Sequence, residues 1–414
     1  MVRVRRLVHT TWLRLVDLLD HARWVVLSLV LACVGLLGVW TEVPRVVNIG
    51  LALTSFGLLW GEWQRHLQSV RSLTFIDRVG DGYDDLAATY RGSTRYSLVK
   101  ANQHHVVLDR VASAAIAADG VTGTVASERY VLPHELRAGV QYRRMRIKRR
   151  DTYNGPLLGL DSDLGSAEVL ATDRWKLLPA RYWDHLASDI MASKIALRSG
   201  RVVPQLGRSL YVDRAGRLRD LGESWLLNGI GTSLLAITSD RRVVVVSQSE
   251  LNESSGGLLA PSGSGSLEPR DLHGASSAGL AAIVANGALR ELSEETGIVA
   301  SEVVETAFLG FGRWVEKAGK PELWSVAWLA IDSHQVRRKR ILNQERPFTT
   351  SVEALRVSDP VSWDADRPEE VLREAESLLL SVPLLIGLRL LVEAYQDPDS
   401  VAGDLVRRAM ATAP

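Results

Sequence analysis

The sequence of 414 residues has one cysteine and almost no net charge. The lone Cys33 cannot form an intramolecular disulfide, which fits a protein kept in a reducing compartment. With 49 basic and 48 acidic residues the formal net charge is +1, so no overall field favours nucleic acid, and we expect no nucleic-acid partner. Phenylalanine is also scarce, at five residues against twelve tryptophans. The length is sufficient for two or three domains.

Charge is absent from two N-terminal runs. No charged residue occurs in 24–41 or in 46–61, and Pro44 between them suits a turn. Each run approaches the ~17–25 residues that cross a bilayer. A cleaved signal peptide would need a small-residue cleavage site and no second span. A buried hairpin in a soluble domain is the other alternative. We interpret residues 1–75 as an N-terminal transmembrane helical hairpin with spans 24–41 and 46–61, and we expect a lipid bilayer as partner.

Basic residues flank this hairpin on both sides. They are Arg3, Arg5, Arg6, Arg14 and Arg23 before it, and Arg65, Arg71 and Arg78 after it. Because positive flanks stay in the cytoplasm, we expect a cell-membrane protein with two spans and with both termini cytoplasmic. Small residues inside the runs would permit close helix packing and a homo-oligomer, although glycine is common in membrane helices; they are Gly35, Gly38, Gly50 and Gly57.

The most informative stretch is 290–298, with the sequence RELSEETGI. It places Glu291, Glu294 and Glu295 on one face of a single helical turn, where like charges repel. A divalent cation reverses that repulsion, and carboxylate oxygens are the ligands that Mg²⁺ and Mn²⁺ prefer. Gly297 follows where a helix can end in a left-handed turn. The run predicts a metal site; the competing interpretation is a solvated helix face.

This run matches the second half of the Nudix box, G-x5-E-x7-R-E-U-x-E-E-x-G-U, where U is aliphatic. The segment therefore resembles the metal-binding helix of the Nudix hydrolases. The resemblance implies that Glu291, Glu294 and Glu295 bind Mg²⁺ or Mn²⁺, with Glu295 and Glu291 catalytic. It also implies that Arg290 pairs with a carboxylate that fixes its orientation.

The first half of the box departs from the pattern. Ala282 stands where the family has a glutamate, and Ser276 stands where it has the opening glycine. Upstream, Gly263 and Gly265 lie in a run that resembles the family's glycine turn, and Glu268 is our candidate for the missing catalytic carboxylate. This departure bears on turnover more than on fold or metal binding.

Strand patterns surround the box. Residues 232–248 read as a hairpin of buried strands, and residues 307–311 and 323–331 as two more. Arg313 and Lys320 are candidates for holding substrate phosphate, and Glu322 for a further ligand or base; an ordinary charged turn explains them equally well. The resemblance implies an α/β/α sandwich with a mixed sheet over 221–398, followed by a tail, 399–414.

Residues 76–220 read as an α+β middle region. We expect a helix over 96–118 and strands over 122–132 and 140–149. The last strand contains a basic run, 143–150, which suits a solvated strand, a patch facing anionic lipid or an anionic-ligand site.

Two functions follow from these patterns. The first is a membrane-anchored Nudix-type hydrolase, Mg-dependent, that cleaves a nucleoside diphosphate linked to another moiety. The alternative is a nucleotide-sensing Nudix domain coupled to a membrane-disrupting hairpin, because the architecture resembles the membrane–Nudix effectors of bacterial cyclic-oligonucleotide antiphage systems.

Overall fold

The structure is a computed structural model. It describes residues 56–57, 60–61, 73–77, 83–118, 122–149, 154–172, 174–250, 256–273, 279–343, 345–373 and 379–411. The predicted spans 24–41 and 46–61 lie outside these residues except at 56–57 and 60–61. Within the described part of the chain, no helix combines the length and the apolar character needed to cross a membrane.

The chain divides into two compact units. The described part of the first unit contains a small sheet of β1 (Leu73–Ile76), β7 (Ile195–Arg198) and β8 (Arg201–Val202). The second unit comprises 77–143, 155–195 and 204–414, so the domain boundary predicted at 220/221 falls inside it. Helix α6 (Ala138–Arg149) spans the division at residue 143. Because these residues are helical, the predicted strand over 140–149 was wrong. Arginine, lysine and methionine have good helix propensity, which outweighs the short alternation of polar and apolar residues.

The main sheet of the second unit contains nine of the described strands, in the order β11-β10-β9-β14-β13-β3-β2, with β12 also on β9 and β15 also on β10. Their bounds are β2 (Tyr96–Ala101), β3 (His104–Asp109), β9 (Gly231–Ile237), β10 (Arg242–Gln248), β11 (Leu259–Pro261), β12 (Gly263–Ser266), β13 (Val303–Trp314), β14 (Lys320–Leu329) and β15 (Thr349–Arg356). The sheet is mixed, because β14 runs parallel to β9 and the other pairs are antiparallel.

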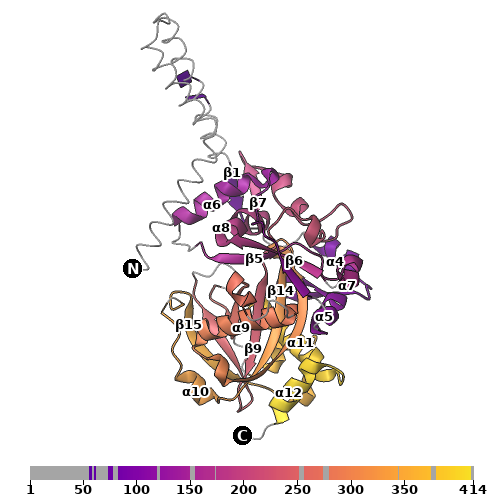
Figure 1. The fold of residues 1–414 in the computed structure, drawn as a ribbon, viewed down its shortest axis with the longest axis vertical. Coiled ribbons are helices and arrows are strands. Elements are labelled where there is room, and N and C mark those ends of the chain that lie inside the picture. The colour runs from indigo at the N-terminus through magenta and orange to yellow at the C-terminus, as the bar shows by residue number, and fades with distance from the viewer. Residues whose placement is uncertain are drawn as a thin grey trace, which may run out of the picture. The chain divides into compact units, whose positions relative to one another are not determined.

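Helices cover both faces of this sheet, and side chains alternate between them. Figure 1 shows α9 (Leu280–Thr296) across the strands β9 and β14. On the α9 face Leu234 and Ala327 pack with Leu292 of the helix. On the other face Leu235 and Trp324 pack with Leu388 of α11 (Val382–Gln396). Helix α12 (Val401–Ala411), in the predicted tail, packs on α11 and β13. The architecture is a mixed α/β fold.

The predicted helix over 96–118 was wrong in its first half. Residues 96–109 form the hairpin β2–β3, and only α5 (Arg110–Ala117) is helical. Two features enforce the break: Asn102 adopts φ 56° in the turn, and the Asp109 carboxylate accepts hydrogen bonds from the N–H groups of Val111 and Ala112. The hairpin joins the main sheet through β3, which pairs with β13.

The second unit also contains a smaller sheet and further helices. A smaller sheet has the order β4-β6-β5, from β4 (Thr122–Val125), β5 (Pro156–Leu160) and β6 (Arg174–Arg181). The remaining helices are α4 (Asp84–Tyr90), α7 (Ala167–Thr172), α8 (Tyr182–His185) and α10 (Ser333–Arg337). Leu158 N–H donates to the Leu267 carbonyl at 2.9 Å, which ties β5 to the residue after β12.

Candidate metal centre

The acidic run forms the last turns of α9, packed on the glycine strand β12. Gly297 ends the helix at φ 76°, and a Cβ there would lie 2.5 Å from the carbonyl oxygen of Arg340. A Cβ on Gly263 would lie 2.6 Å from the Leu292 nitrogen, and one on Gly265 would lie 2.0 Å from an oxygen of Glu291. The two strand glycines let β12 approach the helix closely enough to bring the Ser264 N–H to the Glu295 carboxylate.

Arg290 is held by a carboxylate that the sequence analysis missed. Its Nε and Nη2 donate to the two oxygens of buried Asp271 at 2.8 and 3.0 Å, and Nη2 also donates to the Ser266 carbonyl at 2.9 Å. Such a bidentate pair fixes the guanidinium plane. Asp271 is thus the carboxylate that fixes Arg290, whereas the nearest oxygen of Glu268, our candidate catalytic carboxylate, is 4.0 Å from Arg290. A local signal existed, because Asp271 also accepts the N–H of Glu268, three residues earlier, as in a capping box.

Glu268 still belongs to the acid cluster. One of its oxygens lies 2.7 Å from Nε of Arg270, and Nη2 of Arg270 lies 3.0 Å from Glu294. The side chain of Arg270 is 50% exposed, whereas that of Arg290 is 12% exposed. Arg290 therefore lies buried in the cluster, and Arg270 lies at its solvent-exposed rim.

Two carboxyl groups on α9 have strongly perturbed pKa values. Burial raises the pKa of Glu291 to about 7, although the adjacent Arg290 guanidinium, at 2.7 Å, opposes the shift. Burial and then the charge of Glu291 raise the pKa of Glu295 well above its usual range, against a hydrogen bond of 2.9 Å from the Ser264 N–H. Both side chains are thus unfavourable as buried anions without a compensating cation.

A further carboxylate, Glu345, lies close enough for its charge to raise the pKa of Glu291 and Glu295. Its own pKa is raised by burial and then by the charge of Glu294. The segment before it is tied to the end of α9, because the Leu342 N–H donates to the Glu294 carbonyl at 3.3 Å. No local motif marks Glu345, since only the fold brings it to the helix.

Charge in this cluster is out of balance. Six carboxyl groups, those of Glu268, Asp271, Glu291, Glu294, Glu295 and Glu345, face the guanidinium groups of Arg270 and Arg290. Among the described residues, no three or more acidic, histidine or cysteine side chains are disposed to hold a metal ion as they stand. The reason is visible in the contacts, because Arg290 and Arg270 occupy oxygens of Glu291 and Glu294. The donor chemistry fits a hard divalent cation, since carboxylate oxygens are in excess.

The three predicted substrate residues do not join this cluster. Glu322 and Ser266 both pair with Gly231, which sets them roughly 10 Å apart across β9. However, Glu322 alternates with Leu323, which belongs to the α9-side core, and shares its face with Trp324 on the α11 side. There the Glu322 carboxylate accepts hydrogen bonds from Nζ of Lys320 at 2.5 Å and from Oγ of Ser233 at 2.9 Å.

Arg313 points to the α9 face but lies three strands from β12. Its Nε donates to the Gly319 carbonyl at 3.0 Å and its Nη1 to the Arg219 carbonyl at 2.5 Å. Burial lowers the pKa of this guanidinium, against the nearby phenol of Tyr90 and carboxylate of Asp163. In this arrangement Arg313 secures the loop after β13 rather than facing the acid cluster.

Comparison with known proteins gives a partial likeness to solved structures. No protein-family model matches the chain, and no curated protein matches it. A Nudix hydrolase from Alicyclobacillus acidocaldarius has a TM-score of 0.28 and 13% identity over 40% of this chain and 91% of its own. The Nudix hydrolase RenU from M. Smegmatis has a TM-score of 0.25 and 13% identity over 45% of this chain and 86% of its own.

A third similar structure is a bifunctional NMN adenylyltransferase/ADP ribose pyrophosphatase from Francisella tularensis, in complex with AMP and a Mn ion. Its TM-score is 0.27 with 14% identity, and the likeness covers 40% of this chain but only 41% of that one. All three TM-scores are below 0.5, so the functional assignment rests on the geometry of the acid cluster.

Proposed function

We propose that this protein is a metal-dependent, Nudix-type hydrolase that cleaves a nucleoside diphosphate linked to another moiety. The observation that supports it is the charge imbalance at the end of α9, where six carboxyl groups face two guanidinium groups. Buried like charges cost stability unless a cation neutralises them. A structural cluster would be expected to carry matching cations, as the Lys320–Glu322 pair does.

In this proposal Glu291, Glu294 and Glu295 hold Mg²⁺ or Mn²⁺. The bound ion would neutralise pyrophosphate charge and lower the pKa of an attacking water. Ser264 keeps Glu295 in place through its N–H, and Asp271 keeps Arg290 in place through two hydrogen bonds. Arg270, which is half exposed, is the cation that would release its oxygen of Glu294 when the site is filled.

Glu345 is our candidate for taking the proton of the water. It comes from outside α9, and the described residues offer it no ion pair, unlike Glu268, which is paired with Arg270. A carboxylate that is free of a salt bridge and beside the cluster is better suited to accept a proton than one bound to a guanidinium.

The membrane location remains a proposal. Two uncharged runs with basic flanks support an N-terminal hairpin in the cell membrane, with the α/β unit in the cytoplasm. Fractionation of cells expressing the full chain tests it. Recovery in the membrane fraction after a high-pH carbonate wash supports the hairpin, and full release into the wash contradicts it.

The activity is tested on the full chain with a panel of nucleoside diphosphate compounds, such as dinucleotides and nucleotide sugars, with Mg²⁺ or Mn²⁺. We expect release of a mononucleotide, and a loss of at least about 100-fold in kcat/KM for Glu295→Gln, because a metal ligand should matter at least as much as the groups that orient it. Glu353→Gln, on the exposed surface of β15, is the matched control and should retain activity.

Two other results would redirect the proposal. A nucleotide that binds with Mg²⁺ and is never cleaved favours the sensor function, with Ala282 and the altered first half of the box as the reason. Absence of Mg²⁺ and Mn²⁺ binding by calorimetry, with nucleotide present, rules out both functions.

A further inference from the structure

Strand β2 is an edge of the main sheet with nothing paired on its outer side among the described residues. The register of the hairpin identifies the outward groups. Arg110 N–H donates to the Arg95 carbonyl, so the pairs in register with it, Ser97–Leu108 and Val99–Val106, carry the bonds to β3. The N–H and C=O groups of Tyr96, Leu98 and Lys100 therefore point away from the sheet. Of these, only the Tyr96 N–H has a partner in the described structure, Oγ of Ser93 at 3.1 Å.

The other side of the sheet is protected more fully than β2, which α4 contacts only at its start, through Tyr90 and Tyr96. Strand β15 carries the charged residues Glu353 and Arg356, and helix α10 packs against it. Charge and cover are the devices by which proteins prevent pairing at sheet edges. Strand β2 has neither proline nor bulge, and Lys100 is its one charged residue.

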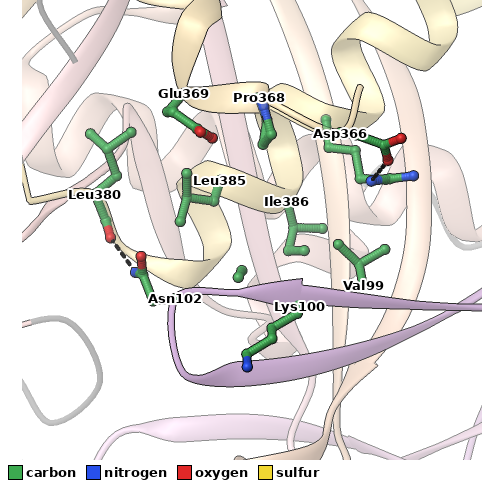
Figure 2. Close-up of a pocket in the computed structure, with 11 residues that line it drawn as sticks. Val99, Lys100, Asn102, Asp366, Pro368, Glu369, Leu380, Leu385 and Ile386 are labelled. Carbon is green, nitrogen blue, oxygen red and sulfur yellow. Dashed lines mark hydrogen bonds and ion pairs between the residues drawn. The ribbon is translucent and has the colours of Figure 1, made fainter. Parts of the chain in front are cut away.

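Two hollows border this strand, one toward each end. A hollow of about 480 Å³ lies beside Val99–Asn102, with Leu385 and Ile386 of α11 on its inner wall (Figure 2). A second hollow, of about 340 Å³, lies beside Tyr96–Leu98. The tip of the hairpin is held in place, because Nδ2 of Asn102 donates to the Leu380 carbonyl at 3.0 Å. The edge is thus both accessible and fixed.

We propose that β2 pairs antiparallel with β2 of a second copy of this chain, about a two-fold axis at Leu98. The sequence of β2, YSLVKA, is self-complementary in that register. Leu98 lies opposite its own copy, and Tyr96 lies opposite the partner's Lys100. Tyr96 and Lys100 share one face of the strand, so each pair would set the Lys100 side chain beside a Tyr96 side chain, whose ring already contacts Arg95 and Tyr90.

The pairing also satisfies the outward backbone groups of β2 apart from the Lys100 carbonyl, because the Tyr96 N–H that would reach it already donates to Ser93. Leu98 would exchange two hydrogen bonds with its copy, and Lys100 N–H would donate to the partner's Tyr96 carbonyl, once in each direction. The exposed Lys100 has no partner among the described residues, and the hydroxyl of the partner's Tyr96 would give its ammonium group one. A two-fold interface of this kind is closed, so it produces a dimer and not a fibre.

Cysteine cross-linking of the full chain in detergent tests this register. Leu98→Cys, with Cys33→Ser to remove the native thiol, should give a covalent dimer with a short bifunctional thiol reagent at low protein concentration. Val304→Cys, at an exposed position of β13, is the matched control and should remain monomeric under the same conditions.

Leu98→Pro provides a second, independent measurement. The Leu98 N–H is not used by β3, so proline is compatible with the hairpin but blocks the outer edge. We expect a monomer by light scattering, with unchanged circular dichroism, and a several-fold weaker dimer for Lys100→Ala. A monomer at all concentrations without cross-linking at position 98 overturns the proposal. So does a dimer that survives Leu98→Pro and fails to cross-link, because it would use another surface, such as the N-terminal runs.

Discussion

The two faces of the main sheet treat a buried glutamate in opposite ways. On the α11 face Glu322 is neutralised by Lys320 and by the hydroxyl of Ser233. On the α9 face Glu295 accepts one backbone N–H and lies among other acids. The first arrangement is complete in itself. The second is costly as it stands, and under the proposed function that cost is relieved by the bound metal ion.

The contrast between Glu322 and Glu295 is tested most directly by removing the charge of each side chain. Glu322→Gln leaves the ammonium of Lys320 without its counter-ion, and we expect a loss of about 3 kcal/mol in the free energy of unfolding. Glu295→Gln in metal-free buffer at pH 8 should raise that free energy, because it removes a carboxyl group that the fold must either protonate or bury as an anion. Urea denaturation monitored by circular dichroism measures both. Equal losses for the two variants would contradict the comparison, and Glu353→Gln should change neither.

The dependence of the free energy of unfolding on pH tests the cost of the buried acids on the α9 face. The pKa of Glu291 is 4.5 in its ordinary state and about 7 in the fold, so between these values the folded chain holds a proton that the unfolded chain has lost. Stability should fall as pH rises from 4.5 to 7, by on the order of 3 kcal/mol. The shift in Glu295 acts in the same direction. Urea denaturation at pH 5 and pH 8 in EDTA measures the change.

Two additions distinguish the source of that pH dependence. Millimolar Mg²⁺ should flatten the dependence, since the cation stabilises the ionised carboxylates. Glu291→Gln should remove much of it. A free energy of unfolding that is constant or rises between pH 5 and pH 8 in EDTA would mean that ionising the acid cluster does not destabilise the fold.

The role of the fixed cation is examined by Arg290→Lys. Lysine retains the charge but cannot make the two parallel hydrogen bonds to Asp271. We expect Mg²⁺ affinity to fall by about 10- to 100-fold, by calorimetry, as for other groups that orient metal ligands. Arg408→Lys, on an exposed salt bridge, is the control. An unchanged affinity would show that the orientation of Arg290 is irrelevant to the metal.

The smallest expected effect on stability comes from a substitution where β12 packs closely against α9. Gly265→Ala would place a methyl group 2.0 Å from a Glu291 oxygen, so that side chain must move. We expect a loss of about 1–3 kcal/mol in the free energy of unfolding, as for other overpacked sites, and weaker metal binding. Gly222→Ala, where the nearest atom would be 3.6 Å from the new Cβ, should be neutral. Thermal denaturation distinguishes the two.

Local pattern was sufficient for the helix of acids and for the strands β9 and β10, because period and spacing reveal both. It was insufficient for Glu345, which lies fifty residues beyond Glu295 and reaches the cluster only through the packing of its loop on α9. Local pattern also led to a wrong helix over β2 and β3. The alternation in the β2 sequence YSLVKA was outweighed by the helix-favouring residues that follow it in the chain. The opposite orientation of Glu322 depends on strand register, which one sequence does not reveal.

The pairing of β3 with β13 has a practical consequence for excision. A fragment that starts at residue 221 would lose β2 and β3, which supply Val99, Val106 and Leu108 to the core beneath α11. Without β3, the edge of β13 up to Trp314 would be exposed to water. An exposed strand edge of this kind can pair with other chains and cause aggregation. A truncation meant to release the part of the chain that holds the main sheet should therefore begin before Tyr83, which is also buried.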